Sequence, residues 1–209
     1  MTDHLYNSAC RTLLQPPSLL PAREILADRS LVPDEAGIYA WWFDEEIPSV
    51  PLEGTLAHGS HRLVYVGIAP RAPSAAGSES KSTLRKRIVR NHLGRRIASS
   101  TLRRSLAWLL KGSLGFEIGR NAAGKTVMAR EDEDRLTRWM SDHAAISFVC
   151  HEQAWHIEDH LITGGPALPL NLKGSTHAFR QQLTALRTTV REIDGRSRLP
   201  FADAALFSC

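Results

Sequence analysis

The segments Ala36–Phe43 (AGIYAWWF) and Arg62–Ile68 (RLVYVGI) decide the fold that this sequence predicts. Each is short and rich in aromatic and β-branched residues, which is typical of a buried β-strand. Residues 47–61 between them contain two prolines and two glycines and are expected to form a loop. A loop between two consecutive strands favours antiparallel pairing. We therefore predict that the two strands lie side by side and that each carries a tyrosine.

The rest of the chain is expected to surround this pair with one more strand and several helices. Residues Ile146–His151 have the composition of a third core strand. Amphipathic patterns predict helices at Thr83–Leu93, Thr101–Lys111, Glu131–Ala144, Gln153–Thr163 and Ala178–Ile193. The predicted fold class is α/β, more strictly α+β: a small three-stranded antiparallel sheet flanked by helices.

Three parts are expected along the chain. Residues 1–35 are predicted to form an N-terminal helical extension, with Leu20 and Ile25 on one face of a helix. Residues 36–174 form the main domain, and residues 175–209 form a C-terminal helix and a tail. A chain of 209 residues is long enough for one main domain with such additions.

Positive charge is concentrated in one part of the sequence. The formal net charge is only +4, but residues 80–116 contain ten basic residues and no acidic one. Such a block attracts polyanions, although a solvated helix face is the ordinary alternative. Nucleic acid is therefore the expected partner, and DNA the expected kind. The candidate nucleic-acid-binding residues are Lys81, Arg85, Lys86, Arg90, Arg95, Arg96, Arg103 and Arg104.

The overall composition favours a soluble globular protein. Hydrophobic residues make up 43% and charged residues 23% of the chain. No apolar stretch approaches the roughly 20 residues that span a bilayer, so no membrane association is expected. The first residues lack a basic leader followed by an apolar run, which favours a cytoplasmic location. The sequence indicates no particular protein partner.

Five short motifs, taken in order, carry a family resemblance. They are GIY at 37–39, YVG at 65–67, L-x-x-R at 84–87, E-x-x-L-I at 158–162 and PLN at 169–171. This ordered set resembles the GIY-YIG nuclease superfamily. The resemblance implies a small antiparallel sheet flanked by helices and cleavage of phosphodiester bonds that depends on a divalent metal ion, Mg²⁺ or Mn²⁺.

The residue types in these motifs suit phosphodiester hydrolysis. By analogy with the family, Tyr39 is the candidate general base, its pKa of about 10 lowered by a nearby cation, and Tyr65 binds the water or the phosphate. Arg87 would place a forked positive charge on the non-bridging oxygens. Glu158 would hold a single Mg²⁺, a hard ion that retains several waters. Asn171 would fix the local backbone and a phosphate or water.

The spacing of the motifs departs from the family pattern in two places. The two tyrosines are 26 positions apart, whereas many members have the two motifs almost adjacent. One helical turn after the arginine, where members carry a histidine or tyrosine, this chain has Asn91 followed by His92. We take His92 as the candidate for that function. In an α-helix the one-residue shift would rotate His92 by about 100° away from the expected direction.

Three alternatives compete with this interpretation. Gly119–Thr126 matches the phosphate-loop pattern G-x-x-x-x-G-K-[ST], which would indicate a nucleotide-binding protein. The preceding residues alternate in polarity, so a hairpin with a turn at 121–124 is preferred. His151, His156 and His160 permit a zinc site but lack the H-E-x-x-H order. The domain could also bind nucleic acid without cleaving it.

Overall fold

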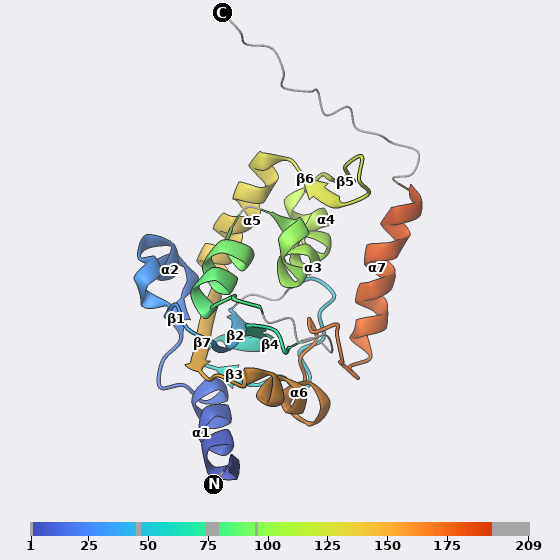
Figure 1. Cartoon of the computed structure of the whole chain (residues 1–209). Coiled ribbons are helices and arrows are strands. Elements are labelled where there is room, and N and C mark those ends of the chain that lie inside the picture. Colours follow the sequence, from blue (N-terminus) through green and yellow to red (C-terminus); the bar gives the residue numbers. More distant parts are fainter. Residues whose placement is uncertain (1, 45–46, 74–79, 95, 194–209) are drawn as a thin grey trace, which may run out of the picture.

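The two tyrosine-bearing strands form the centre of a five-stranded antiparallel sheet (Figure 1). The structure is a computed structural model that describes residues 2–44, 47–73, 80–94 and 96–193. The strand order is β1-β7-β2-β4-β3. The strands are β1 (Leu20–Pro21), β2 (Gly37–Phe43), β3 (Ala57–His58), β4 (His61–Ala69) and β7 (Ala144–Cys150).

The prediction of a three-stranded sheet was wrong by two short edge strands. The three long strands lie where the sequence indicated, and β2 pairs with both β4 and β7. Leu20, expected on a helix, instead lies in β1 and pairs with Ile146 of β7. The expected loop at 47–61 contains β3. Two residues are too few to show a period in the sequence. Such short strands form only by pairing with a longer neighbour, which the sequence does not reveal.

Helices cover both faces of the sheet (Figure 1). The helical segments are α1 (Thr2–Leu14), α2 (Ala22–Ala27), η1 (Arg29–Leu31), η2 (Lys86–His92), η3 (Ile97–Ser99), α3 (Thr101–Leu109), α4 (Lys111–Leu114), α5 (Arg130–His143), α6 (Ala154–Gly164) and α7 (Phe179–Ile193). The predicted hairpin is present as β5 (Ile118–Arg120) and β6 (Thr126–Met128). None of the helices in the described ranges is long and apolar enough to span a membrane.

Strand β2 is buried on both faces, which explains its nearly continuous apolar sequence. Tyr39 and Trp41 face the larger hydrophobic cluster, which includes residues of α2, α3, α5 and α7. Ile38 and Trp42 face the second cluster, which includes residues of α1 and α6. The described parts of both predicted extensions therefore pack onto the core. The boundaries at 35/36 and 174/175 stay predictions.

The glycines of the two tyrosine motifs allow close approaches. Gly67 pairs with Tyr39 across β2 and β4, and a Cβ atom at Gly67 would lie 2.6 Å from the Tyr39 hydroxyl oxygen. The phenol ring can therefore lie across β4 only because residue 67 has no side chain. A Cβ atom at Gly37 would similarly meet the carbonyl of Val149 and lie 2.7 Å from a methyl group of Leu84.

The outer edge of β4 is completed by the Pro-Leu-Asn segment. Leu170 N donates a hydrogen bond to Val64 O at 3.0 Å. Val66 N donates to Asn171 Oδ1, and Asn171 Nδ2 donates to Val66 O, both at 2.9 Å. The amide side chain thus satisfies one backbone donor and one acceptor, as a neighbouring strand would. This attachment brings the following residues to the edge of β4.

Candidate active site

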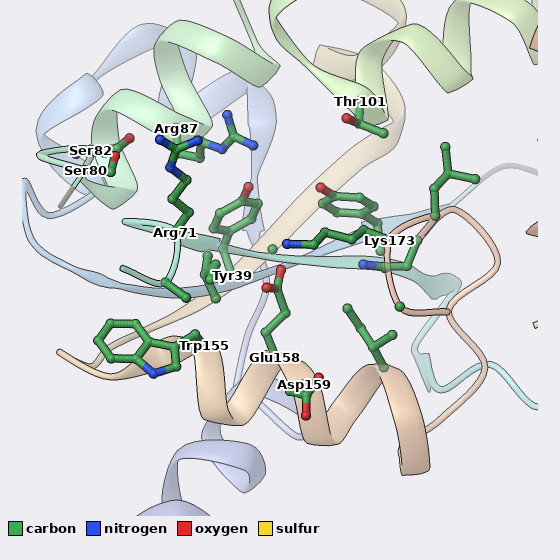
Figure 2. Close-up of a pocket in the computed structure, with 18 of the residues that line it drawn as sticks. Tyr39, Arg71, Ser80, Ser82, Arg87, Thr101, Trp155, Glu158, Asp159 and Lys173 are labelled. Atoms are coloured by element: carbon green, nitrogen blue, oxygen red, sulfur yellow. Dashed lines mark hydrogen bonds between the residues drawn. The ribbon is translucent and has the colours of Figure 1, made fainter. Parts of the chain in front are cut away.

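A cavity of about 790 Å³ beside β4 brings together most of the predicted catalytic residues. Its lining includes Tyr39 from β2, Tyr65 from β4, Arg87 from η2, Glu158 from α6 and Asn171. Figure 2 shows Glu158 extending from α6 toward Tyr39, with Arg71 and Arg87 on the side of the cavity away from α6. Segments more than 100 positions apart in the sequence therefore meet at one site.

His92 packs against both tyrosines of the site. Its Nε2 atom is 2.7 Å from the Tyr39 hydroxyl oxygen, and both side chains are fully buried. Its ring packs edge-on against those of Tyr39 and Tyr65, with centroids 5.3 and 5.9 Å away. Asn91, its neighbour, lines the cavity instead. His92 can therefore act on Tyr39 but is not among the residues that line the cavity.

A π-helical turn brings His92 into this position. Residues 86–92 form a π-helix, and Leu93 N donates to Ile88 O at 2.9 Å across five residues. In such a turn, residues five apart, such as Arg87 and His92, come nearly into line along the helix. The rotation of about 100° expected for His92 assumed α-helical geometry and was wrong for this reason.

A buried polar network supports His92 from the side away from Tyr39. Ser100 Oγ lies 2.8 Å from His92 Nδ1 and accepts a hydrogen bond from Arg103 N at 3.0 Å. Arg103 Nη1 also donates to the carbonyl of His92 at 3.2 Å. Arg103 in turn forms a buried ion pair with Glu133 at 3.0 Å. The histidine is thus held through both its ring and its backbone.

Burial dominates the ionisation of both tyrosines. It raises the pKa of Tyr39 well above its ordinary value and that of Tyr65 to about 12. The positive charge of Arg87 acts in the opposite direction on both groups. The predicted lowering of the Tyr39 pKa was therefore wrong for the cavity without a bound cation, because loss of hydration outweighs the charge of one guanidinium.

Glu158 has the surroundings of an oxygen ligand to a cation. Burial raises its pKa to about 7, while the charges of Lys173 and then Arg87 act in the opposite direction. Among the residues described, none donates a hydrogen bond to its carboxylate, and no cluster of three or more metal-binding side chains is found. A single free carboxylate fits a hard divalent ion that keeps most of its waters. It does not fit zinc, which takes three or four protein ligands.

The eight predicted nucleic-acid-binding residues differ in their surroundings. Lys81, Lys86, Arg90 and Arg96 are exposed and can meet a polyanion. Arg85 donates to the carbonyl of Val32, and Arg104 donates to those of Ile97 and Ala98. Arg95 lies outside the described residues.

The prediction for Arg103 was wrong. Its side chain is fully buried and paired with Glu133 in α5, so it cannot contact a nucleic acid. Its partner lies 30 positions further along the chain, outside the basic segment, so local composition could not reveal the pair.

A second, basic cleft adjoins the cavity. It has a volume of about 1480 Å³ and shares Ser82 and Asn91 with the cavity lining. Six basic residues line it: Arg29, Lys86, Arg90, Arg96, Arg135 and Arg138. Two acidic residues, Glu131 and Asp134, lie among them. Half of the basic residues, from η1 and α5, lie outside the basic segment that the sequence singled out.

Arg71, Lys173 and Trp155 also line the cavity but were not predicted as site residues from the sequence. Arg71 lies in a stretch rich in proline, alanine and serine, whose composition gives no sign of a functional residue. Lys173 follows the Pro-Leu-Asn motif by two positions, and Trp155 precedes Glu158 by one helical turn. Their closeness to those motifs is the signal that could have revealed Lys173 and Trp155.

The structure bears on two of the alternatives. Gly119–Thr126 forms the hairpin of β5 and β6, with Gly124 N donating to Asn121 O at 2.8 Å. A phosphate loop instead leads directly into a helix N-terminus, which is absent here because β6 follows. Of the three histidines considered for zinc, only His156 lines the cavity.

Comparison with known protein families gives one match. A family model described as the GIY-YIG catalytic domain matches residues 37–189, which is more than half of the chain. The matched region begins at β2 and includes every residue placed in the cavity above. No curated protein and no solved structure matches the chain significantly.

Proposed function

The chain belongs to the GIY-YIG catalytic domain family, a nuclease family, and from this membership we propose that it is a metal-dependent endonuclease that hydrolyses phosphodiester bonds of DNA. The observation that supports this most directly is the composition of the cavity. It places two carboxylates, the half-buried Glu158 and the exposed Asp159, with two phenols and two guanidinium groups around a space of about 790 Å³. This is the set of groups that phosphodiester hydrolysis requires.

The cationic side chains would bind the phosphate. Arg87 can donate two parallel hydrogen bonds to non-bridging oxygens, because its guanidinium is planar and always charged. Arg71 lies on the same side of the cavity (Figure 2) and can hold the same or the adjacent phosphate. Lys173 adds a third positive charge near Glu158. Together these groups would orient the phosphorus atom and offset the charge that develops on it.

Glu158 would hold the divalent cation, Mg²⁺ or Mn²⁺. Such an ion, when bound, supplies positive charge beside the phosphate and lowers the pKa of an attacking water. Tyr39 would accept the proton of that water, and Tyr65 would donate a hydrogen bond to the phosphate. Burial opposes ionisation of Tyr39, so its activity as a base depends on the positive charges gathered at the cavity.

The basic cleft supports a nucleic acid as the substrate. It leads away from the cavity and offers exposed guanidinium and ammonium groups on η2 and α5. Contacts of this kind hold the sugar–phosphate backbone without reading its sequence. A strand whose scissile phosphate lies at Arg87 could continue along this cleft.

The test is cleavage of labelled DNA and RNA oligonucleotides, single- and double-stranded, by wild type, Tyr39→Phe and Tyr65→Phe. Both substitutions keep the ring and remove only the hydroxyl group. We expect Tyr39→Phe to lose about 10²- to 10⁴-fold in rate, and Tyr65→Phe to lose less. Equal rates for wild type and Tyr39→Phe would exclude the general-base role. Binding without cleavage by the wild type would instead indicate an inactive nucleic-acid-binding domain.

A further inference from the structure

The ring of His92 has one polar partner at each nitrogen. Nε2 lies 2.7 Å from the Tyr39 hydroxyl oxygen, and Nδ1 lies 2.8 Å from Ser100 Oγ. Burial lowers the pKa of His92 well below its ordinary value, and the charges of Arg87 and Arg103 act in the same direction. The ring is therefore neutral and carries a hydrogen on only one nitrogen. Which nitrogen carries it decides the direction of the hydrogen bond to Tyr39.

The hydrogen bonds of Ser100 select between the two tautomers. Ser100 is 1% exposed, and its Oγ already accepts the hydrogen bond from Arg103 N that caps α3. Within the described part of the chain, His92 Nδ1 is the remaining partner of this hydroxyl group. A hydrogen on Nδ1 would leave the hydroxyl hydrogen of Ser100 buried without an acceptor, at a cost of about 1–3 kcal/mol. If Nδ1 accepts instead, the donors of Ser100 and His92 both have acceptors, and the hydroxyl group of Tyr39 has that of Tyr65 as a hydrogen-bond partner.

We propose that Ser100 is a positioning residue that fixes the His92 tautomer, donating its hydroxyl hydrogen to Nδ1 so that Nε2–H donates to the hydroxyl oxygen of Tyr39. The inference rests on the proposed function only in giving Tyr39 a catalytic role. The direction of the hydrogen bonds follows from the geometry and from the neutral state of the buried ring, not from that role.

This direction has a consequence for Tyr39. Because Nε2 already carries a hydrogen, His92 does not receive the proton of Tyr39. The hydroxyl hydrogen of Tyr39 is then donated away from His92, and the hydroxyl group of Tyr65, which also lines the cavity, is its hydrogen-bond partner. The Nε2–H group would also stabilise a phenolate at Tyr39, which partly offsets the effect of burial. Ser100 thus prepares Tyr39 to lose its proton toward the cavity.

The tautomer can be measured without substrate. In the ¹⁵N-labelled full chain, the side-chain nitrogen shifts of His92, assigned by comparison with His92→Gln, distinguish Nε2–H from Nδ1–H. We expect Nε2–H in the wild type and in Ser100→Thr, which keeps the hydroxyl group. We expect Nδ1–H in Ser100→Asp, because a carboxylate can only accept, while it still caps α3. Cleavage should fall by about 10²- to 10⁴-fold in Ser100→Asp and stay near wild type in Ser100→Thr.

Each result has a definite meaning. Nδ1–H in the wild type overturns the inference, whatever the cleavage activity. An inverted tautomer in Ser100→Asp with an unchanged cleavage rate overturns the positioning role. If Ser100→Asp fails to fold, Ser100→Ala replaces it, and retention of Nε2–H as the sole tautomer there would contradict a determining role of Ser100. A wild type with Nε2–H that cleaves no nucleic acid overturns the proposed nuclease function but not the assigned hydrogen bonds.

Discussion

Glu158 combines a role in the proposed chemistry with a cost in stability. Its pKa is raised to about 7 by burial, from an ordinary value of 4.5. Between these two values the folded protein binds more protons than the unfolded chain. The stability therefore falls as the pH rises through this range, and the penalty is complete above about pH 7. Above that pH the carboxylate is ionised and available to a cation.

Glu158→Gln is expected to stabilise the metal-free protein above pH 7. The amide cannot ionise, so the gain should be about 1–3 kcal/mol at about pH 8 and small near pH 5. Mn²⁺ should raise the Tm of the wild type but not of the variant, because only the wild type keeps the carboxylate. Thermal unfolding in EDTA and in Mn²⁺ measures both effects. The exposed Glu152→Gln is the control, and an equal response to Mn²⁺ in wild type and Glu158→Gln would rule out Glu158 as the ligand.

Single residues were predictable from the sequence where a motif fixed them. Tyr39, Tyr65, Arg87 and Glu158 all line the cavity. Their ionisation was not predictable, because it depends on how much water the surrounding core excludes. The role of Gly67 became clear only when the register placed it opposite Tyr39.

At the scale of elements, α3 and α5 are joined by a buried ion pair that also reaches η2. Arg103 in α3 pairs with Glu133 in α5 and donates to the carbonyl of His92. Glu133 Oε1 also accepts a hydrogen bond from Ile97 N at 2.7 Å. The basic segment thus contains both a buried arginine that joins elements of the fold, Arg103, and arginines that face solvent, Arg90 and Arg96.

Arg103→Met is expected to destabilise the protein by about 3–5 kcal/mol, because it leaves the charge of Glu133 buried without an opposite charge beside it. The double variant Arg103→Met with Glu133→Leu should recover much of that loss. Arg90→Ala, an exposed position, should leave the free energy of unfolding within about 0.5 kcal/mol of wild type. Urea unfolding measures all three variants. A stable Arg103→Met that only binds DNA less tightly would show that Arg103 has the role first predicted from its charge.

Element types followed from the sequence more reliably than element geometry. Periodicity located the long helices and the three long strands, because each buries a regular apolar face. It could not indicate the π-turn at 86–92, which requires one unusual set of hydrogen bonds within an otherwise helical pattern. That turn decides whether His92 or Asn91 contacts Tyr39.

At the scale of the whole molecule, the cavity and the basic cleft adjoin at Ser82 and Asn91, and together they are the surface proposed for a strand of nucleic acid. The sequence predicted the basic segment but not the other basic residues that line the cleft. Arg29 and Arg138 lie beside that segment only because of the tertiary fold. Arg29 and Arg138 are exposed and lie in η1 and α5.

Arg90→Ala and Arg138→Ala are each expected to weaken DNA binding and to reduce the slope of log Kd against log salt by about one. Both positions line the cleft, whereas the exposed Arg62, in β4, lines neither the cleft nor the cavity. Fluorescence anisotropy over a series of salt concentrations measures the slopes. Equal effects of Arg62→Ala and Arg138→Ala would argue against the cleft as the binding path.

The most direct test of the proposed function is cleavage of supercoiled plasmid and single-stranded DNA with and without Mg²⁺, comparing wild type with Glu158→Ala. Of the two carboxylates that line the cavity, Glu158 is half-buried and Asp159 is exposed, and the proposed metal binding is assigned to Glu158. We predict cleavage by the wild type that requires the metal, and none by Glu158→Ala. Equal cleavage by both proteins, or by the wild type in EDTA, would contradict the proposed site.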